Sequence, residues 1–257
     1  QPILARVRHG HIALAHNGNL TNAIELRREL EDDGAIFSST MDSEVIVHRI
    51  ARATAREPEA RVAQALAGVE GAYCLMVVLD ETVVAARDPH GWRPLVMGRL
   101  GDGWVFASET CALDIVGATL EREVLPGEIV AIDQHGLRSV QLPAAEQVHR
   151  CVFEHVYFAR PDSKVFGGSV DRSRRALGRQ LAIECPAPGA ELVFAVPDSS
   201  NSAALGYSEE SGIPYELALI RNHYIGRTFI QPTQAGRDAK VKVKYNPVRE
   251  LLEGKSV

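Results

Sequence analysis

The stretch His16-Asn17-Gly18-Asn19-Leu20 tells more about this chain than any other five residues. It follows the apolar run 12–15 and comes just before the start of a predicted helix. An Asn-Gly pair in such a place is usually a turn. The same pair also suits an oxyanion hole, because the Asn17 side-chain amide and the Gly18 backbone N–H are donors that stabilise a tetrahedral acyl intermediate. Taken alone, the stretch favours the turn.

The residues after this stretch predict helices followed by a run of strands. Asn22 and Glu25 have the spacing of a capping box at the start of a first helix. Asp42 opens a second helix, and a short third helix is expected over 60–67. From 72 to 133 the apolar runs are short and separated by turn signals, which is typical of strands. Helices in a run beside strands in a run predict layers of both kinds.

The second part of the chain has a different pattern. Residues 139–149 are polar and contain Pro143, so we place a domain boundary there and divide the chain into 1–145 and 146–257. Beyond the boundary, strands and helices are expected to alternate. The expected strands are 152–158, 191–196 and 215–220, and the expected helices are 173–183 and 202–211. This alternation predicts a parallel sheet with crossover helices.

Composition and charge exclude several classes of function. The net charge is −5 over 257 residues, which argues against nucleic acid as the main partner. No apolar run approaches the roughly 20 residues that span a bilayer, and no signal peptide is visible, so we expect no membrane and a cytoplasmic location. The cysteines form no C-x-x-C pair, so no internal zinc site is expected. They are Cys74, Cys111, Cys151 and Cys185.

Several motifs occur in the order found in one family of enzymes. The stretch 16–20, followed by Ser-Thr-Met-Asp-Ser-Glu at 39–44, resembles the class II glutamine amidotransferases. Residues 87–95 read Arg-Asp-Pro-His-Gly-Trp-Arg-Pro-Leu and resemble a later landmark of the glutamine phosphoribosylpyrophosphate amidotransferase family. Residues 151–163, from Cys-Val-Phe-Glu-His to Arg-Pro-Asp-Ser, resemble the start of the phosphoribosyltransferase half of that family. The resemblance implies an αββα sandwich of the N-terminal-nucleophile type, followed by a type I phosphoribosyltransferase domain with a parallel sheet.

The resemblance also assigns roles at a glutamine site. Asn17 and Gly18 would be the oxyanion donors, and Asp42 would receive the α-ammonium group of glutamine. In isolation, Asp42 is better explained as a helix-terminal carboxylate that the helix dipole stabilises. Most of 87–95 is better explained by turns and packing than by chemistry.

A second set of roles concerns phosphoribosylpyrophosphate. Residues 197–201, Pro-Asp-Ser-Ser-Asn, lie between an expected strand and an expected helix. Spacing alone favours an ordinary N-cap there, although such a helix start also binds anions. The resemblance implies a pyrophosphate loop in which Ser199 would help to hold Mg²⁺ and Ser200 would contact the substrate. It also implies that the basic stretch 221–244 closes over the substrate.

This basic stretch holds six basic residues against one acidic residue. A solvated loop is the usual explanation of such a charge run, but a cationic lid would suit a substrate with several phosphates and would exclude water. The match singles out Tyr224 and Lys244. In many members of the family a cysteine at the position of Cys151 is a ligand of a [4Fe–4S] cluster, which needs four thiolates, so Cys151 is a candidate ligand.

The implied reaction has two halves. Glutamine is hydrolysed through a thioester to release ammonia, and the ammonia displaces pyrophosphate from phosphoribosylpyrophosphate to give 5-phosphoribosylamine, the first step of purine nucleotide synthesis. Purine nucleotides would act as feedback ligands, and the family implies a homo-oligomer, a tetramer. The chain starts at Gln1, without the N-terminal nucleophilic Cys of the family, and stops before its Asp-Asp motif. We interpret it as an internal part of a longer protein and expect that it makes neither product alone.

Three other interpretations stay open. The phosphoribosyltransferase fold also serves as a non-catalytic ligand sensor, but sensors lack a glutaminase half. A sibling amidotransferase would send ammonia to another acceptor, which the phosphate-binding motifs between 151 and 244 oppose. A degenerate homologue would keep the fold without activity.

Overall fold

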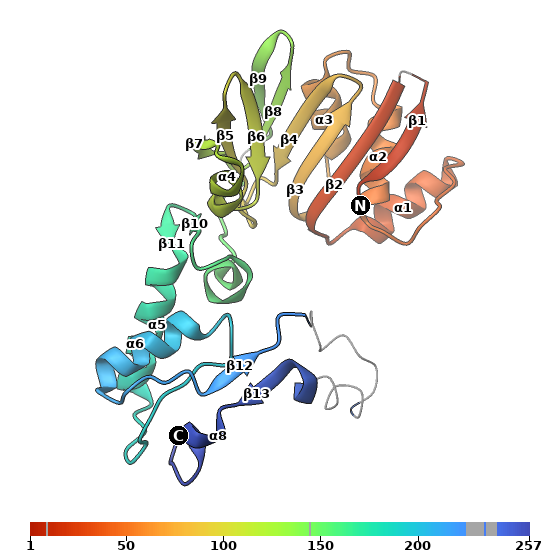
Figure 1. The fold of residues 1–257 in the computed structure, drawn as a ribbon. Coiled ribbons are helices and arrows are strands. Elements are labelled where there is room, and N and C mark those ends of the chain that lie inside the picture. Colours follow the sequence, from red (N-terminus) through yellow and green to blue (C-terminus); the bar gives the residue numbers. More distant parts are fainter. Residues whose placement is uncertain (9, 144, 225–233, 235–240) are drawn as a thin grey trace. The chain divides into compact units, whose positions relative to one another are not determined.

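The computed structural model of this protein describes residues 1–8, 10–143, 145–224, 234 and 241–257. They form two compact units, 1–152 and 153–257, whose folds are shown in Figure 1. The sequence-based division into 1–145 and 146–257 stays a prediction about domains.

A six-stranded antiparallel sheet is the centre of the first unit. Its strands, in their hydrogen-bonded order, are β1 (Ile3–Val7), β2 (Gly10–Leu20), β3 (Gly71–Leu79), β4 (Thr82–Arg87), β8 (Glu128–Asp133) and β9 (Gly136–Gln141). The Asn-Gly pair lies within β2, where Asn17 is opposite Cys74 and Gly18 is opposite Tyr73 of β3. The turn that the pair suggested by itself is therefore wrong, because an eleven-residue strand continues through it.

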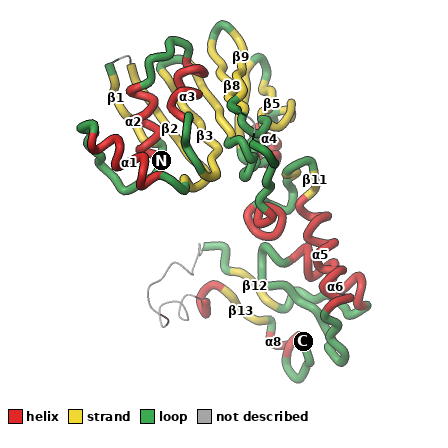
Figure 2. Tube along the Cα trace, turned by 180° about the vertical axis from the view of Figure 1, so that it is seen from behind, coloured by secondary structure: helices red, strands yellow, loops and turns green. Residues whose placement is uncertain are grey.

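Three helices cover one face of this sheet, as Figure 2 shows from behind. They are α1 (Ala23–Asp32), α2 (Ser43–Arg52) and α3 (Pro58–Leu66). Alternate residues of β3, such as Tyr73 and Leu75, point toward the helices and share a core with Ile46 and Ile50 of α2. All four side chains are almost fully buried, so this interface supplies much of the apolar burial that stabilises the unit.

A second, three-stranded sheet covers the other face of the large sheet. It consists of β6 (Gly103–Ala107), β5 (Val96–Leu100) and β7 (Thr119–Glu123), in that order. The residues of β3 and β4 that point away from the helices, Cys74 and Ala85, share a separate core with Met97 of β5. Helix α4 (Thr110–Val116) packs on the small sheet through Leu113. The first unit therefore has four layers: helices α1–α3, the six-stranded sheet, the three-stranded sheet and helix α4. This is the αββα order that the resemblance implies.

The second unit is built around two helices. It contains the short π-helix η1 (Glu154–Phe158), β10 (Lys164–Val165), β11 (Gly168–Ser169), α5 (Val170–Glu184), α6 (Asn201–Ser211), β12 (Leu219–Arg221), β13 (Tyr245–Pro247) and α8 (Arg249–Leu252). The helices expected over 173–183 and 202–211 are confirmed by α5 and α6. Each contributes a glycine at the point of closest approach, Gly178 and Gly206, where a Cβ atom would lie about 2 Å from a backbone oxygen of the other helix.

The strands expected in this unit are mostly wrong. Residues 152–158 contain η1, whose His155 carbonyl oxygen and the adjoining Ala159 carbonyl oxygen accept hydrogen bonds from the Arg174 guanidinium at 2.6 and 2.7 Å. This buried side chain takes up carbonyl groups that a strand would offer to a neighbouring strand. Among the described residues, parallel pairing is limited to a bridge between Val193 and Tyr215, and β12 starts only at Leu219. Local apolar runs predicted strands here, but pairing depends on partners elsewhere in the chain.

Candidate functional site

The two predicted oxyanion donors lie near one end of β2. The Asn17 side chain is exposed and its Nδ2 atom lies 3.4 Å from Ser108 Oγ, just after β6. Asn17 and Ser108 both line a cavity of about 230 Å³ between β2, β3 and β6. The other lining residues are Gln1, Ala15, His16, Cys74, Met76, Leu95, Phe106 and Ala107. The donor amide therefore faces a small, largely apolar cavity at the edge of the two sheets.

Gly18 is required by the packing around it. Its φ is +154°, and a Cβ atom added there would lie 2.0 Å from the Ala72 carbonyl oxygen and 2.8 Å from His16 Nε2. A backbone oxygen cannot move aside easily. The missing side chain at Gly18 thus keeps β3 and the His16 ring close to the end of β2.

Asp42 joins the same strand end. It immediately precedes α2, but its carboxylate makes no capping hydrogen bond to that helix. Instead, Oδ2 accepts the backbone N–H of Leu20 at 2.9 Å, and Oδ1 accepts the Ser43 hydroxyl at 3.1 Å. The side chain is 27 % exposed, so the carboxylate has an open edge. The structure brings Asp42 to the stretch 16–20, as the glutamine-site assignment requires.

The segment before Asp42 is held by a buried carboxylate, Glu44. The two Glu44 oxygens accept hydrogen bonds from the backbone N–H groups and hydroxyls of Ser38 and Ser39, at 2.6–2.9 Å. Burial raises the pKa of Glu44, but these hydrogen bonds outweigh it and lower the pKa from 4.5 to about 2. The charged form is therefore built into the fold.

Residues 87–95 are held by buried hydrogen bonds, and Leu95 is the member of this stretch that lines the cavity. Asp88 is fully buried and accepts the backbone N–H groups of Tyr73, His90 and Trp92 at 3.0–3.3 Å. Burial raises the pKa of Asp88, while these backbone hydrogen bonds oppose the shift. Arg87, also buried, donates to the Arg93 carbonyl oxygen at 2.8 Å. The sequence-based preference for turns and packing agrees with these contacts.

Three residues near the donors and Asp42 received no role from the sequence: His16, Ser43 and Ser108. His16 Nδ1 lies 2.9 Å from Ser43 Oγ, and the His16 side chain is only 2 % exposed. Both His16 and Ser43 belong to quoted motifs, but nothing in their spacing indicated that they touch. Ser108 lies 91 residues from Asn17, so only the sheet-on-sheet packing brings it to the site.

A second candidate site is a pocket of about 430 Å³ in the second unit. It brings together three predicted residues, Ser199, Ser200 and Lys244. The other lining residues are Tyr157, Phe158, Ala159, Arg160, Pro161, Arg174, Val196, Pro197, Asp198, Arg221 and Tyr245. Lysine and arginine thus supply four of the five charged side chains of the pocket, a balance that suits an anionic ligand.

The loop before α6 is held by one hydrogen bond of its own and by contacts with Arg221 and Tyr245. Ser200 directly precedes the helix, but its hydroxyl donates to the Val196 carbonyl oxygen at 2.5 Å and makes no capping bond. The neighbouring Asp198 carboxylate pairs with Arg221, and the Tyr245 hydroxyl donates to the Pro197 carbonyl oxygen at 3.0 Å. The Ser200 side chain therefore does not cap α6, although spacing alone favoured an ordinary N-cap.

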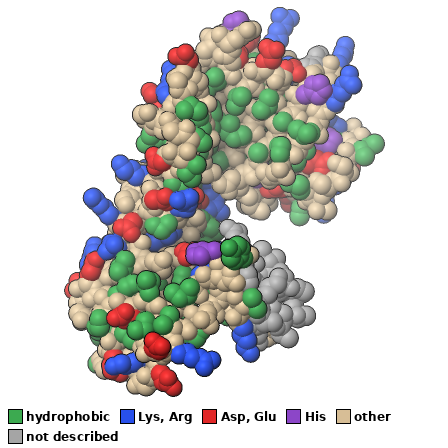
Figure 3. Space-filling model, in the orientation of Figure 1, with side chains coloured by type: hydrophobic (Ala, Val, Ile, Leu, Met, Phe, Trp, Pro, Cys, Tyr) green, Lys and Arg blue, Asp and Glu red, His purple; other side chains and the backbone are tan. Residues whose placement is uncertain are grey.

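Tyr224 does not line this pocket; it is 99 % exposed. Of the predicted lid 221–244, the structure describes 221–224, 234 and 241–244, and the rest lies outside the described residues. Lys244 lies over the Tyr245 ring, with Nζ 5.1 Å from the ring centroid. On the face drawn in Figure 3, lysine and arginine side chains are interspersed with acidic ones over the described surface.

Cys151 is half-buried at the end of the first unit. Its backbone N–H donates to the Trp92 carbonyl oxygen at 3.1 Å, next to a stack of the Trp92 and His149 rings with centroids 5.0 Å apart. Within the described ranges, no three His, Cys, Asp or Glu side chains are grouped so that they could hold a metal ion. Cys151 is the one cysteine that the resemblance assigns to the cluster.

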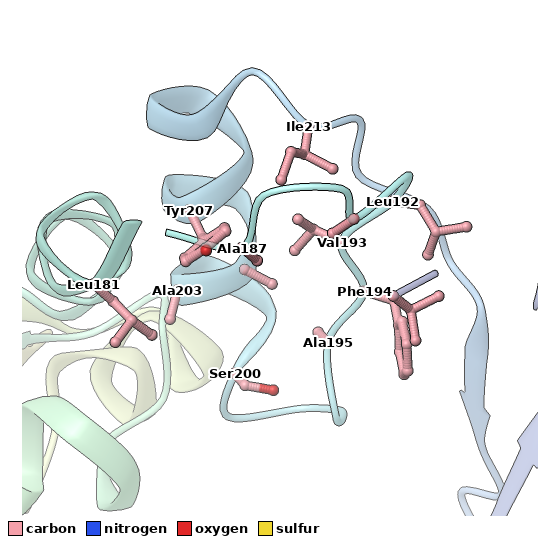
Figure 4. Close-up of a pocket in the computed structure, with 13 residues that line it drawn as sticks. Leu181, Ala187, Leu192, Val193, Phe194, Ala195, Ser200, Ala203, Tyr207 and Ile213 are labelled. Carbon is pink, nitrogen blue, oxygen red and sulfur yellow. The ribbon is translucent and has the colours of Figure 1, made fainter. Parts of the chain in front are cut away.

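A third pocket, of about 320 Å³, lies between α5, α6 and residues 187–195. Figure 4 shows Leu181, Tyr207 and Ile213 around it, together with the extended segment that carries Leu192 and Phe194. Its lining is apolar apart from the Ser200 and Tyr207 hydroxyl groups.

No helix in the described part of the chain combines the length and apolar character needed to cross a bilayer.

The chain is similar to known proteins. Residues 1–114 match the model of a glutamine amidotransferase domain. The whole chain is 50 % identical to amidophosphoribosyltransferase 1, chloroplastic, of Arabidopsis thaliana, of which it covers 45 %, and 46 % identical to amidophosphoribosyltransferase of Bacillus subtilis, of which it covers 54 %. The chain thus spans about half the length of these relatives.

A solved structure gives the same result. The glutamine phosphoribosylpyrophosphate amidotransferase of B. subtilis, in complex with ADP and GMP, matches with a TM-score of 0.88 and 46 % identity. The match covers 99 % of this chain and 56 % of that one. At this identity and TM-score, the class II amidotransferase-type α/β fold of the first unit agrees with that of a solved relative.

Proposed function

We propose that this chain, which carries a glutamine amidotransferase domain and is homologous over its whole length to amidophosphoribosyltransferases, belongs to an enzyme that aminates phosphoribosylpyrophosphate. Glutamine, water and phosphoribosylpyrophosphate would give glutamate, pyrophosphate and 5-phosphoribosylamine, the first step of purine nucleotide synthesis. The observation that carries the proposal is that Asn17, Gly18 and Asp42 meet at one end of β2.

In the glutaminase reaction, each of these three residues would have a separate task. A nucleophile that attacks the amide carbon of glutamine leaves a negative charge on the amide oxygen. The Asn17 side-chain amide and the Gly18 N–H would stabilise that charge. The Asp42 carboxylate would fix the other end of the substrate through its α-ammonium group, which places the reacting amide.

We further propose that 153–257 forms part of a phosphoribosyltransferase domain that binds phosphoribosylpyrophosphate in the 430 Å³ pocket. Lys244 and the backbone around Ser200 would contact phosphate groups, and Tyr224 would belong to the segment that closes over them. The Ser199 hydroxyl and the Asp198 carboxylate are hard oxygen donors of the type that Mg²⁺ prefers. When bound, Mg²⁺ would neutralise charge on the pyrophosphate leaving group.

Other parts of the proposal rest on the family alone. Cys151 would be one ligand of a [4Fe–4S] cluster, but a single thiolate does not make such a site, so no step is assigned to the cluster. Purine nucleotides are proposed as feedback ligands, because the B. subtilis relative was solved with ADP and GMP. A homo-oligomer and a cytoplasmic location remain predictions.

The test is a pair of assays on the intact gene product. Glutamate release from glutamine and pyrophosphate release from phosphoribosylpyrophosphate should be coupled, and ammonia should replace glutamine in the second assay only. Substitution of Asn17 by Ala should reduce glutamate release by about 10²–10³-fold and leave the ammonia-dependent reaction intact. Binding without either product would indicate a ligand sensor or a degenerate homologue. Glutamate release without pyrophosphate release would indicate another ammonia acceptor.

A further inference from the structure

A short hydrogen-bonded chain connects the first residue of the stretch 16–20 to Asp42. His16 Nδ1 lies 2.9 Å from Ser43 Oγ, and Ser43 Oγ lies 3.1 Å from Asp42 Oδ1. The direct distance from His16 Nδ1 to Asp42 Oδ1 is 3.6 Å. The three atoms form a triangle in which the Ser43 hydroxyl is within hydrogen-bond distance of both other groups, whereas His16 Nδ1 and Asp42 Oδ1 are farther apart.

The proton positions in the hydrogen-bonded series His16–Ser43–Asp42 are restricted. A hydroxyl has one hydrogen, and an ionised carboxylate only accepts. If the Ser43 hydrogen is donated to Asp42, the 2.9 Å contact to His16 is a hydrogen bond only when Nδ1 carries a proton. The other ring nitrogen, Nε2, faces the Ala72 carbonyl oxygen at the longer distance of 3.4 Å. The two shorter contacts thus favour protonation of Nδ1.

Burial fixes the ring and the hydroxyl in place. Ser43 is fully buried and the His16 side chain is 2 % exposed. Gly18 leaves room for the ring, because a Cβ there would lie 2.8 Å from His16 Nε2. The second carboxylate oxygen of Asp42 is held independently by the Leu20 N–H at 2.9 Å. Each Asp42 oxygen therefore has one fixed donor, and the exposed edge remains for a substrate.

We propose that His16 is a positioning residue: it carries a proton on Nδ1 and, through the Ser43 hydroxyl, fixes the Asp42 carboxylate in the orientation that receives the ammonium group of glutamine. The inference rests on the proposed glutamine site and adds His16 and Ser43 to it. The proposed role needs no contact of either residue with the substrate. Both act by setting the direction of the Asp42 carboxylate.

The variants follow from the ring geometry. The side-chain amide of Asn can reach the position of Nδ1, whereas that of Gln extends toward Nε2. His16→Asn should therefore keep the link to Ser43, and His16→Gln and Ser43→Ala should break it. His11→Asn is the matched control, because His11 is an exposed histidine on the same strand.

The first measurement needs no substrate. Imidazole ¹⁵N NMR of the 257-residue chain, with the His16 signals assigned through His16→Asn, should show a protonated Nδ1. A neutral ring protonated only at Nε2 would overturn the proposal. Urea denaturation of every variant identifies any that does not fold.

The second measurement is titration of the same chain with L-glutamine, followed at the Leu20 amide. The expected result is a saturable shift, weakened about tenfold by Ser43→Ala and His16→Gln, with His16→Asn within about threefold of wild type and His11→Asn unchanged. If wild type binds and the Ser43 and His16 variants bind equally well, the positioning role is wrong and the glutamine site stands. If folded wild type shows no shift, the glutamine site itself fails, and the positioning role with it.

Discussion

Gly18 shows how one missing side chain can determine a site. The Ala72 carbonyl oxygen and the His16 ring occupy the space that a Cβ atom would need. Both are fixed by the pairing of β2 with β3. The glycine is therefore required by the close approach of the two strands, in addition to any role of its N–H as an oxyanion donor.

Replacement of Gly18 by Ala should destabilise the first unit by at least about 2 kcal/mol, because the new methyl group would collide with backbone. Gly136→Ala is the matched control. Gly136 also has a positive φ, +107°, but nothing lies within 4 Å of the position of its Cβ. Urea denaturation measures both. An equal loss for the two variants would show that conformation, and not the collision, is responsible.

Glu44 gives the first unit a defined dependence on pH. Its pKa is lowered from 4.5 to about 2 in the folded state, so the folded chain binds fewer protons than the unfolded chain between these values. The resulting stabilisation, at most about 3 kcal/mol, is present above about pH 4.5 and is lost as the pH falls toward about 2. Urea denaturation across this range should show the loss. Glu44→Gln should reduce that slope, and an unchanged slope would contradict the assignment.

Helices α5 and α6 illustrate how an element depends on its neighbour. Their closest contacts are Gly178 against the Ala203 carbonyl oxygen and Gly206 against the Arg175 carbonyl oxygen. The interface also contains a hydrogen bond of 2.6 Å from Ser202 Oγ to Asp171 Oδ1. Two small residues facing opposite backbones allow the helices to approach closely.

Glycine in a helix normally costs about 0.5–1 kcal/mol relative to alanine, so Gly→Ala would stabilise an isolated helix. Here the sign should reverse. Gly178→Ala and Gly206→Ala should each destabilise the second unit by about 2 kcal/mol or more, because a Cβ would lie 1.9 or 2.1 Å from backbone oxygen. Circular dichroism during urea denaturation is the measurement. A gain in stability would mean that the helices can separate at little cost.

The charged pocket of the second unit is assembled from segments far apart in the chain. Arg160 follows η1, Ser199 precedes α6, and Lys244 precedes β13. A ligand that contacts all three would hold the folded unit together, because binding to the folded state alone stabilises it by mass action.

Phosphoribosylpyrophosphate with Mg²⁺ should therefore raise the free energy of unfolding of the second unit, measured by urea denaturation, by about 2.7 kcal/mol at a concentration one hundred times the Kd. Lys244→Ala should abolish most of this gain, and added salt should weaken it. Lys164→Ala is the control, since Lys164 is exposed, lies outside the stretch 221–244 and does not line the pocket. Equal effects of the two substitutions would remove Lys244 from the site.

The motifs, two helices of the second unit and the layers of the first unit could be predicted from the sequence. The strings at 16–20, 39–44 and 87–95 indicated an amidotransferase domain, and the alternating pattern beyond the boundary predicted helices over 173–183 and 202–211, which are present. Such features are local, because helix spacing and motif identity depend on neighbours along the chain. Helices in a run beside strands in a run predicted layers of both kinds in the first unit, and the resemblance added the αββα order.

Other features depend on which distant residues meet. The Asn-Gly pair looked like a turn, but pairing with β3 makes it strand. Residues 152–158 looked like a strand, but Arg174 binds carbonyl groups of η1 and of Ala159, directly after it. Asp42 looked like a helix cap, but its carboxylate turns to Leu20, 22 residues away. In each case a hydrogen-bond partner supplied by another segment outweighs the local preference, and sequence periodicity carries no information about such partners.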